Sequence, residues 1–504
     1  MHAVNIGRVL LDSADRSPDR VALVIPREQR IDFTFAELAR GALRRAAVLE
    51  ARGLHRGDRI ALVAGNDEHF VATWFAITLL GATVVPIPVV SPAAEIRVRL
   101  ELAHVKAIVA DAPRAEAARS AAGDRRVLAI ESLDDVDAKP IGPRDPGDPS
   151  CAMILFTSGT SGGPRGAAIA HRALVDHTRS LVTDVLRLGA DDVTLGVLPL
   201  THSYGCRMVM LASVIAGARF VLVPRFDAQR SLDVMRGERI TFLPGVPTMF
   251  AAWGDLDDTP PPPSLRWCLS AGAPIADETV RRAEARLAAE LRQGYGLTEA
   301  TFSTVNAPPD ARIIGSVGRA VPGVEIRIVD PDGAVCEPDR DGEIQVRGVN
   351  VMSRYLDDAV ATREAFVDGW LRTGDVGRLD ADGRLRVVDR IKDLVIRGGN
   401  NVYPSEVEGV LASHPSVAAV AVVGRRDAHY GEEVVAVIVP RAGSVIDIAQ
   451  LDAYARERLA STKVPREIVV VTEFPLGPSG KVLKRVIREC IESGEWKPTR
   501  IPRV

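Results

Sequence analysis

Short apolar runs alternate with longer amphipathic segments through the first half of the chain. Residues 35–52 and 93–106 have the pattern of helices, and short apolar runs lie between and after them. The same alternation returns after residue 150. The runs that predict strands are residues 59–63, 107–110, 127–130, 194–197, 219–223, 240–243 and 267–269. Because strands and helices follow one another in turn, the pattern indicates α/β layers around largely parallel sheets.

The pattern changes near residue 324, where short strand-like runs and Asp-Gly turn signals replace the alternation. Residues 324–329, 343–346 and 385–388 predict a small β-rich subdomain. From about residue 393 the chain predicts a compact α+β unit, with strands at residues 417–423, 434–439 and 468–471 and a helix at 448–459. The predicted fold class is therefore α/β: a large N-terminal domain of α/β layers with a small β-rich subdomain, followed by a small α+β C-terminal domain.

One uncharged stretch, residues 71–90, is long enough to span a bilayer. Gly81, Pro86 and Pro88 interrupt it, and its second half is β-branched, so it predicts a buried helix over 71–80 and a buried strand over 83–87. Charged residues also break up the N-terminal segment, which lacks the apolar core of a signal peptide. We therefore expect a cytoplasmic protein without a transmembrane span.

Composition narrows the function classes. A chain of 504 residues is too long for one core, so several folding units are expected. The net charge is −3, and no long basic run is present, so nucleic acid is not an expected partner. The five cysteines are scattered without metal-site spacing, which predicts reduced thiols. Only seven of the 63 basic residues are lysines, so each lysine is informative.

A segment rich in glycine and hydroxyl side chains follows the apolar run at residues 153–156. Glycines let the backbone approach an anion and turn N–H groups toward it, while hydroxyl and guanidinium groups add donors. By composition alone, a flexible surface loop is the alternative. The candidate phosphate-binding residues are Thr157, Ser158, Gly159, Thr160, Ser161, Gly162 and Arg165.

Three further motifs follow in chain order. Residues 294–299 place an aromatic ring, a hydroxyl and a carboxylate around a tight turn. Residues 369–375 and 389–404 form the next motif, and Pro-Ser-Gly-Lys at residues 478–481 the last. In this order and spacing, together with the phosphate loop, they resemble the adenylate-forming superfamily of acyl-CoA synthetases, adenylation domains and luciferases. The resemblance covers nearly the whole chain.

The resemblance implies an ATP site. The phosphate loop would hold the β- and γ-phosphates of ATP, Thr298 would reach the α-phosphate, and Glu299 would bind Mg²⁺. Tyr295 would stack on adenine, and Asp375, helped by Arg390, would accept hydrogen bonds from the ribose. The other residues expected to line the nucleotide site are Gly272, Ala273, Pro274, Gly294 and Gly296.

The resemblance also implies the catalytic groups. Lys481 would bridge the substrate carboxylate and the phosphoester oxygen, because two anions meet in this reaction and positive charge must offset their repulsion. His202 matches the histidine that lies between the acyl pocket and the thiol channel in relatives that form acyl-CoA. A satisfied packing histidine is the alternative for His202.

Domain rotation is a further implication. Lys481 must leave before a thiol can approach the same carbonyl, so a mobile C-terminal domain is expected to rotate. The predicted division is an N-terminal domain at residues 1–388, a hinge at 389–392 that includes Lys392, and a C-terminal domain at 393–504. Gly398 and Gly399 fit the stretch that lines the path of the pantetheine arm of coenzyme A.

Two residues of the phosphate loop depart from the family pattern. Most relatives have Lys in place of Arg165 and Thr in place of Ser161. Because arginine offers a bidentate fork where lysine offers a point charge, we expect a modest effect on nucleotide affinity.

The acyl pocket is expected to lie beside His202. Arg207 is ambiguous there: pointing inward, it could hold a second carboxylate, but an arginine on a helix near a surface is usually solvated, and we favour the solvated arrangement. Tyr204 and Met208 favour an apolar tail or ring. The residues expected to border the pocket are Tyr204, Gly205, Arg207, Met208, residues 245–249, Gly272 and Gly294.

The leading functional hypothesis is an ATP-dependent acyl-CoA synthetase with a fatty acid as substrate. The alternative is an adenylating enzyme that passes its acyl group to an acyl carrier protein or another acceptor. A catalytically inactive nucleotide-binding protein is disfavoured because Glu299, Asp375 and Lys481 are all present. A P-loop kinase is disfavoured because no glycine-rich segment fits its motif. The acid and the oligomeric state, monomer or homodimer, stay open.

Overall fold

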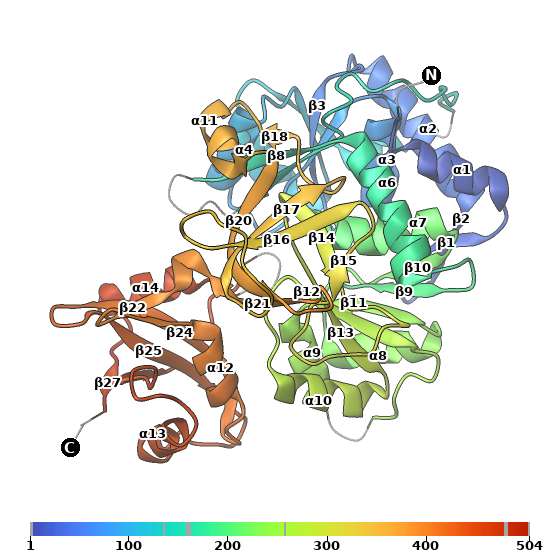
Figure 1. Ribbon diagram of the computed structural model, residues 1–504. Coiled ribbons are helices and arrows are strands. Elements are labelled where there is room, and N and C mark those ends of the chain that lie inside the picture. The colour runs from blue at the N-terminus through green and yellow to red at the C-terminus, as the bar shows by residue number, and fades with distance from the viewer. Residues whose placement is uncertain (1–3, 135–136, 158–162, 257–258, 478–481, 502–504) are drawn as a thin grey trace.

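Four β-sheets organise the computed structural model, which describes residues 4–134, 137–157, 163–256, 259–477 and 482–501. Two large sheets with their helices form the main body, a smaller sheet lies against it, and the fourth sheet forms a separate lobe near the C-terminus (Figure 1). This arrangement confirms the predicted α/β fold class.

The first large sheet has nine strands. In spatial order they are β15 (Arg319–Ala320), β14 (Ala300–Val305), β13 (Glu290–Leu297), β12 (Trp267–Ala271), β11 (Phe242–Gly245), β9 (Val193–Gly196), β10 (Arg219–Leu222), β1 (Val21–Ile25) and β2 (Ile31–Thr34). The strands from β13 to β1 pair in parallel, and the edge strands are antiparallel. Their carboxyl ends therefore lie along one edge of the sheet.

The second large sheet has seven strands. In spatial order they are β18 (Arg354–Tyr355), β8 (Arg165–Ile169), β7 (Met153–Thr157), β4 (Thr83–Pro86), β3 (Arg59–Val63), β5 (Ala107–Ala110) and β6 (Arg126–Ala129). Apolar side chains of α4 (Ala93–Leu102) and α5 (Ala115–Ala122) form one core with its strands, and the remaining strand residues join the main core of the body.

The long uncharged stretch of the sequence lies inside the body. Helix α3 (Glu68–Leu79) begins at Asp67, whose side chain accepts from the backbone N–H of Phe70, and nearly all of its residues are buried. It packs against β3, β4 and the amphipathic α2 (Phe35–Ala51). The stretch is thus a buried helix followed by strand β4, as predicted, and no helix among the described residues is long and apolar enough to cross a membrane.

The remaining helices of the body flank the nine-stranded sheet, with α8, α9 and α10 grouped apart from α1, α6 and α7 (Figure 1). Two segments, η3 and η4, are π-helical, a rare form that is frequent at functional sites. The elements are α1 (Arg8–Arg16), η1 (Ala112–Arg114), η2 (Ile130–Leu133), α6 (His171–Ser180), η3 (Leu181–Leu186), η4 (Gly205–Leu211), α7 (Ala212–Ala216), α8 (Ala228–Gly237), α9 (Pro247–Gly254) and α10 (Asp277–Leu287).

The third sheet is the predicted β-rich subdomain. Its strands are β16 (Val324–Val329), β17 (Gly342–Gly348), β20 (Trp370–Leu379) and β19 (Phe366–Val367), with β21 (Leu385–Arg390) paired to β20. Helix α11 (Ala359–Ala365) connects β18 to this sheet. Every pairing within the sheet is antiparallel, as the short strands and turn signals indicate.

The fourth sheet belongs to the C-terminal α+β unit. Its strands are β23 (Asn400–Val402), β22 (Val395–Arg397), β25 (Gly431–Pro440), β26 (Glu467–Val470) and β27 (Thr499–Arg500), with β24 (Val417–Asp427) paired to β25. Helices α12 (Pro404–Ala412) and α13 (Ile448–Arg456) contribute to one apolar core, and α14 (Lys484–Glu492) contributes to a second core.

A short connection, η5 (Ile391–Asp393), joins β21 to this unit. The backbone N–H of Ser405 donates to Asp389 across the connection at 2.9 Å, and Arg441 pairs with Asp255 of the main body at 3.1 Å. The hinge at residues 389–392 stays a prediction.

Several predicted boundaries are wrong: the helix predicted over residues 448–459 ends at Arg456, and the strand predicted over 417–423 runs on to Asp427. Two others differ for a local reason. The helix predicted over residues 93–106 ends at Leu102, because His104 adopts a positive φ of 44° that a right-handed helix cannot continue. The strand predicted over 240–243 begins only at Phe242, because Arg239 has a φ of 55° and the N–H of Ile240 still donates to Met235 of α8.

Candidate active site

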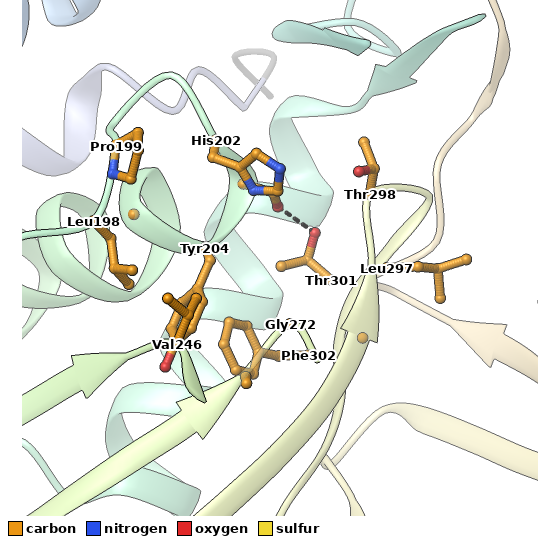
Figure 2. Close-up of a pocket in the computed structure, with 14 residues that line it drawn as sticks. Leu198, Pro199, His202, Tyr204, Val246, Gly272, Leu297, Thr298, Thr301 and Phe302 are labelled. Carbon is orange, nitrogen blue, oxygen red and sulfur yellow. Dashed lines mark hydrogen bonds between the residues drawn. The ribbon is translucent and has the colours of Figure 1, made fainter. Parts of the chain in front are cut away.

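A largely apolar pocket lies at the carboxyl ends of strands β9, β11, β12 and β13, the edge at which open α/β sheets bind ligands (Figure 2). Tyr204, Val246 and Phe302 lie together at one end of it, and His202 and Thr298 lie at the other (Figure 2). The pocket therefore has an apolar end and a more polar end. The predicted site residues that line it are His202, Tyr204, Gly205, Gly272, Gly296 and Thr298.

The loop that carries His202 is fixed from several sides. Asn66 clamps it: its Nδ2 donates to the carbonyl of Leu198 at 2.7 Å, and its Oδ1 accepts from the N–H of Leu200 at 2.9 Å. The hydroxyl of Tyr204 donates to the carbonyl of Leu269 at 2.7 Å. A side chain at Gly205 would place its Cβ 2.3 Å from the carbonyl oxygen of Pro199, so only glycine fits there. These contacts hold the loop that carries His202 at the pocket.

The turn between β13 and β14 and the residues beside it form the opposite wall of the pocket. A Cβ at Gly296 would lie 2.2 Å from the backbone nitrogen of Phe302, so the glycine allows the two strands to approach. Phe302 has a positive φ of 50° and packs its ring edge-on against Tyr204, with centroids 5.0 Å apart. The hydroxyls of Ser203 and Thr301 lie 2.5 Å apart and tie this wall to the His202 loop (Figure 2).

Glu299 lies in the same turn, directly before β14. Its Oε1 accepts a hydrogen bond from the hydroxyl of Tyr355 at 2.8 Å. Burial, together with the nearby Glu299 charge, raises the pKa of Tyr355, so the hydroxyl remains a donor. The guanidinium of Arg165 lies 5.6 Å from the Tyr355 ring centroid and 3.8 Å from the carboxylate of Asp358. Arg165, Tyr355 and Glu299 thus form one polar cluster beside the start of β8, which follows the predicted phosphate-loop segment in the sequence.

A second polar cluster surrounds Asp375, which is buried on β20. Its Oδ2 accepts from the hydroxyl of Tyr295 at 2.7 Å, and its Oδ1 pairs with Arg390 at 2.9 Å. Asp375 and Arg390 are direct register partners across β20 and β21. The Asp375 carboxylate raises the pKa of Arg390, whereas burial raises the pKa of Tyr295, assisted by the same carboxylate. The structure therefore brings together the three residues expected at adenine and ribose.

No group of three or more His, Cys, Asp or Glu side chains in the described ranges could hold a metal ion alone. Mg²⁺ is commonly bound by one or two carboxylates together with substrate phosphates and water. The carboxylate of Glu299, oriented by Tyr355, fits such a site.

The favoured arrangement of Arg207 is wrong. The side chain is not solvated: Arg207 is 1% exposed and lies on the π-helical η4, where it approaches His177 of α6. Neither Arg207 nor Met208 lines the described pocket, and Gly294 supports its wall from behind, with a Cβ there 3.3 Å from the Phe302 ring. Of residues 245–249, Val246 lines the pocket.

The other predicted residues lie apart from the pocket. Ala273 and Pro274 are exposed after β12. Lys392 lies on η5, where burial and the charge of Arg390 lower its pKa. Gly398 and Gly399 form the tip of the β22–β23 hairpin with positive φ values of 55° and 79°, which suit the tight turn. Ser158, Gly159, Thr160, Ser161, Gly162 and Lys481 lie outside the described residues.

Sequence reasoning missed several residues of the site. Asn66, Phe302 and Tyr355 belong to segments that carry no recognised motif. The hydrogen-bond partners of Asn66 and Tyr355 lie at least 56 residues away in the sequence, and Phe302 packs where Gly296 leaves room for its backbone. Their aromatic type is the signal that Phe302 and Tyr355 give.

Comparison with known proteins identifies the family. Residues 10–356 match the AMP-binding enzyme family, and residues 406–481 match the AMP-binding enzyme C-terminal domain. The chain is 36% identical to an indoleacetate–CoA ligase of Aromatoleum aromaticum, covering 95% of this chain and 96% of that protein. It is 37% identical to a feruloyl-CoA synthase of Amycolatopsis, covering 90% and 93%.

A solved structure gives the same result. The ATP-bound MatB of Rhodopseudomonas palustris superimposes with a TM-score of 0.90 at 31% identity, covering 97% of this chain and 99% of that one. The family match spans well over half of the chain. The two CoA-forming relatives match it over 96% and 93% of their own length. The chain therefore belongs to the AMP-binding enzyme family, and it is an ATP-dependent acid–thiol ligase.

Proposed function

We propose that the chain converts a carboxylic acid and ATP into an acyl-adenylate and pyrophosphate, and then transfers the acyl group to coenzyme A with release of AMP. One observation carries this proposal. The β13–β14 hairpin lines the apolar pocket with Gly296, Leu297 and Thr298, and the same hairpin reaches both polar clusters through Tyr295 and Glu299. An acid in the pocket and a nucleotide on the clusters would meet at Thr298.

In the first half-reaction, the acid's tail would occupy the apolar end and its carboxylate would lie near His202 and Thr298. Asp375, which accepts a hydrogen bond from Tyr295 and pairs with Arg390, would also accept hydrogen bonds from the ribose hydroxyls. The residues from Thr157 to Arg165 would donate to the β- and γ-phosphates. Mg²⁺ on Glu299 would supply charge neutralisation at the phosphates.

Lys481 would neutralise the charge that develops between the acid carboxylate and the α-phosphate. In the second half-reaction the C-terminal domain, residues 393–504, would rotate about residues 389–392 and carry Lys481 away. Gly398 and Gly399 would then line the path of the coenzyme A thiol, and His202 would stand between that path and the acyl group.

We further propose that the acid is a compact aromatic or arylalkanoic acid. Two relatives above 35% identity are named for aromatic acids, indoleacetate and ferulate. Tyr204, Val246 and Phe302 crowd the apolar end and suit a flat ring better than a long flexible chain. A fatty acid, which the sequence suggested, is the competing class.

Mass spectrometry of the purified protein with ATP, Mg²⁺ and a panel of acids tests both proposals. The panel contains benzoate, phenylacetate, indole-3-acetate, ferulate, hexanoate, palmitate and succinate, with and without coenzyme A. Acyl-CoA and AMP from the aromatic acids are the expected products. Acyl-CoA from palmitate alone would reject the aromatic class, and acyl-AMP that never passes to coenzyme A would favour loading of an acyl carrier protein.

A further inference from the structure

Arg207 is an unusual buried cation. It is 1% exposed and forms no ion pair with any described carboxylate, and its Nε lacks a hydrogen-bond partner within the described residues. Its Nη1 instead lies 2.6 Å from Nδ1 of His177, which is itself fully buried. Burial lowers the pKa of Arg207 to about 10, so the guanidinium still carries its charge at neutral pH. A buried arginine without a counter-ion is costly, which suggests that its contact with His177 has a use.

The contact fixes the proton of His177. A guanidinium can only donate, so Nδ1 of His177 must accept and its proton must reside on Nε2. That nitrogen lies 3.1 Å from the carbonyl oxygen of Phe302 and therefore donates to it. Burial, reinforced by the Arg207 charge, holds the pKa of His177 well below its usual value, which keeps the ring neutral as this arrangement requires.

The carbonyl that receives this bond belongs to a strained residue of the pocket wall. Phe302 has a φ of 50°, a left-handed conformation that a bulky residue avoids unless its surroundings impose it. Its ring lines the apolar end of the pocket and packs against Tyr204. Gly294 and Gly296 leave room for the ring and backbone of Phe302.

We propose that Arg207 and His177 are positioning residues that hold Phe302 in this conformation and thereby set how large an acid the pocket accepts. The chain of contacts runs from the Arg207 guanidinium to Nδ1 of His177, and from Nε2 of His177 to the carbonyl of Phe302. Without it, Phe302 relaxes toward a common backbone conformation and its ring leaves the wall. The inference rests on the proposed function only in that the pocket binds the acid.

The test compares His177→Gln with His177→Leu. Glutamine keeps one acceptor for Arg207 and one donor for Phe302, whereas leucine keeps neither. Arg207→Met and Phe302→Ala complete the set. The measurement is kcat/KM for benzoate, phenylacetate, 3-phenylpropanoate and 4-phenylbutanoate, together with the KM for ATP.

We expect His177→Leu and Arg207→Met to raise the ratio of kcat/KM for 4-phenylbutanoate to that for benzoate by about tenfold, with an unchanged KM for ATP. His177→Gln keeps the wild-type ratio, and His177→Leu adds nothing in a Phe302→Ala background. An equal fall for every acid, or a shift in His177→Gln as large as in His177→Leu, would overturn the proposal. So would an effect of Arg207→Met confined to acids with a second carboxylate, because Arg207 would then bind substrate directly.

A measurement on the wild-type protein tests the proposal even if His177→Leu or Arg207→Met fails to fold. Nitrogen NMR of protein with labelled histidine reports which ring nitrogen carries the proton. The signals of His177 are assigned as those that disappear in His177→Gln. A proton on Nε2 of His177 is the expected result, and a proton on Nδ1 overturns the proposal. A wild-type protein that activates no acid removes the proposed function instead, whereas activity with an unshifted acid profile removes only the role of Arg207 and His177.

Discussion

Replacing Tyr355 by phenylalanine isolates the orientation of Glu299. The substitution removes the hydroxyl that donates to Oε1 of Glu299 at 2.8 Å and keeps the ring that faces Arg165 at 5.6 Å. If Glu299 binds Mg²⁺, the loss leaves its carboxylate less well directed toward the metal. Residues that orient a metal ligand in this way affect metal affinity without touching the metal.

The expected magnitude follows from the bond that is lost. A hydrogen bond to a charged group contributes about 1.5–3 kcal/mol, and because Tyr355 and Glu299 are both only partly buried, the lower end applies. About 1.5 kcal/mol corresponds to a roughly tenfold higher Mg²⁺ concentration at half-maximal rate. The pKa of Tyr355 is raised by burial, so its hydroxyl stays protonated across the neutral range and the effect should not depend on pH there.

The assay is pyrophosphate release at saturating acid and ATP, titrated with Mg²⁺. Tyr454→Phe is the matched control, because it removes a tyrosine hydroxyl that contacts Ser413 on an exposed surface of the C-terminal unit. The reasoning is refuted if Tyr355→Phe has the same Mg²⁺ dependence as the wild type and the control, or if it lowers the rate equally at every Mg²⁺ concentration.

Three further predictions concern catalysis, packing and pH. Lys481→Ala should abolish acyl-adenylate formation while thioester formation from supplied acyl-adenylate persists, which separate assays of the two half-reactions check; equal loss of both contradicts its role. Gly296→Ala should destabilise the fold by about 1–3 kcal/mol, because its Cβ would meet the backbone nitrogen of Phe302 at 2.2 Å. Gly237→Ala, whose Cβ would have no atom within 4 Å, should not destabilise it, and thermal unfolding distinguishes the two variants. Burial lowers the pKa of His171 from 6.5 to about 4, and its Nδ1 accepts from the N–H of Ile6. As the pH falls, this histidine is therefore protonated in the unfolded state at a higher pH than in the folded state. The stability that this histidine contributes, up to about 3 kcal/mol, is present above pH 6.5 and is lost as the pH falls toward 4. His171→Gln should flatten this part of the curve of unfolding free energy against pH, whereas His429→Gln, at an exposed position, should not.

The sequence predicts the body of the fold well, because buried parallel strands are short apolar runs that need no long-range information. Strands β3 and β5 have the predicted bounds, and the buried helix α3 is recognisable because Gly81 and the following prolines end it. The boundaries that fail, at His104 and Arg239, depend on positive φ angles at residues whose type does not signal them.

The site is less predictable, because its important contacts join segments far apart in the chain. Motif resemblance selects Tyr295, Asp375 and Arg390, and their mutual contacts agree with that selection. It cannot select Tyr355, whose role depends on a contact with a residue 56 positions away. Arg207 fails for a different reason: no local pattern reveals that its helix is π-helical and packs against α6, α7 and β9.

The cluster at Asp375, where we propose that the nucleotide binds, also lies beside the predicted hinge. Arg390 ends β21, pairs with Asp375 at 2.9 Å, and stands two residues before Lys392. A ribose hydroxyl that donates to Asp375 would share this carboxylate with Arg390, at the point where the chain leaves the main body. Arg390→Gln should therefore raise the KM for ATP and alter the rate of the second half-reaction, whereas Arg386→Gln, on the same strand but opposite Arg378 instead of Asp375, should do neither. If Arg390→Gln changes the KM for ATP alone, the nucleotide site and the hinge are independent, and the closeness of Arg390 to Lys392 has no functional consequence.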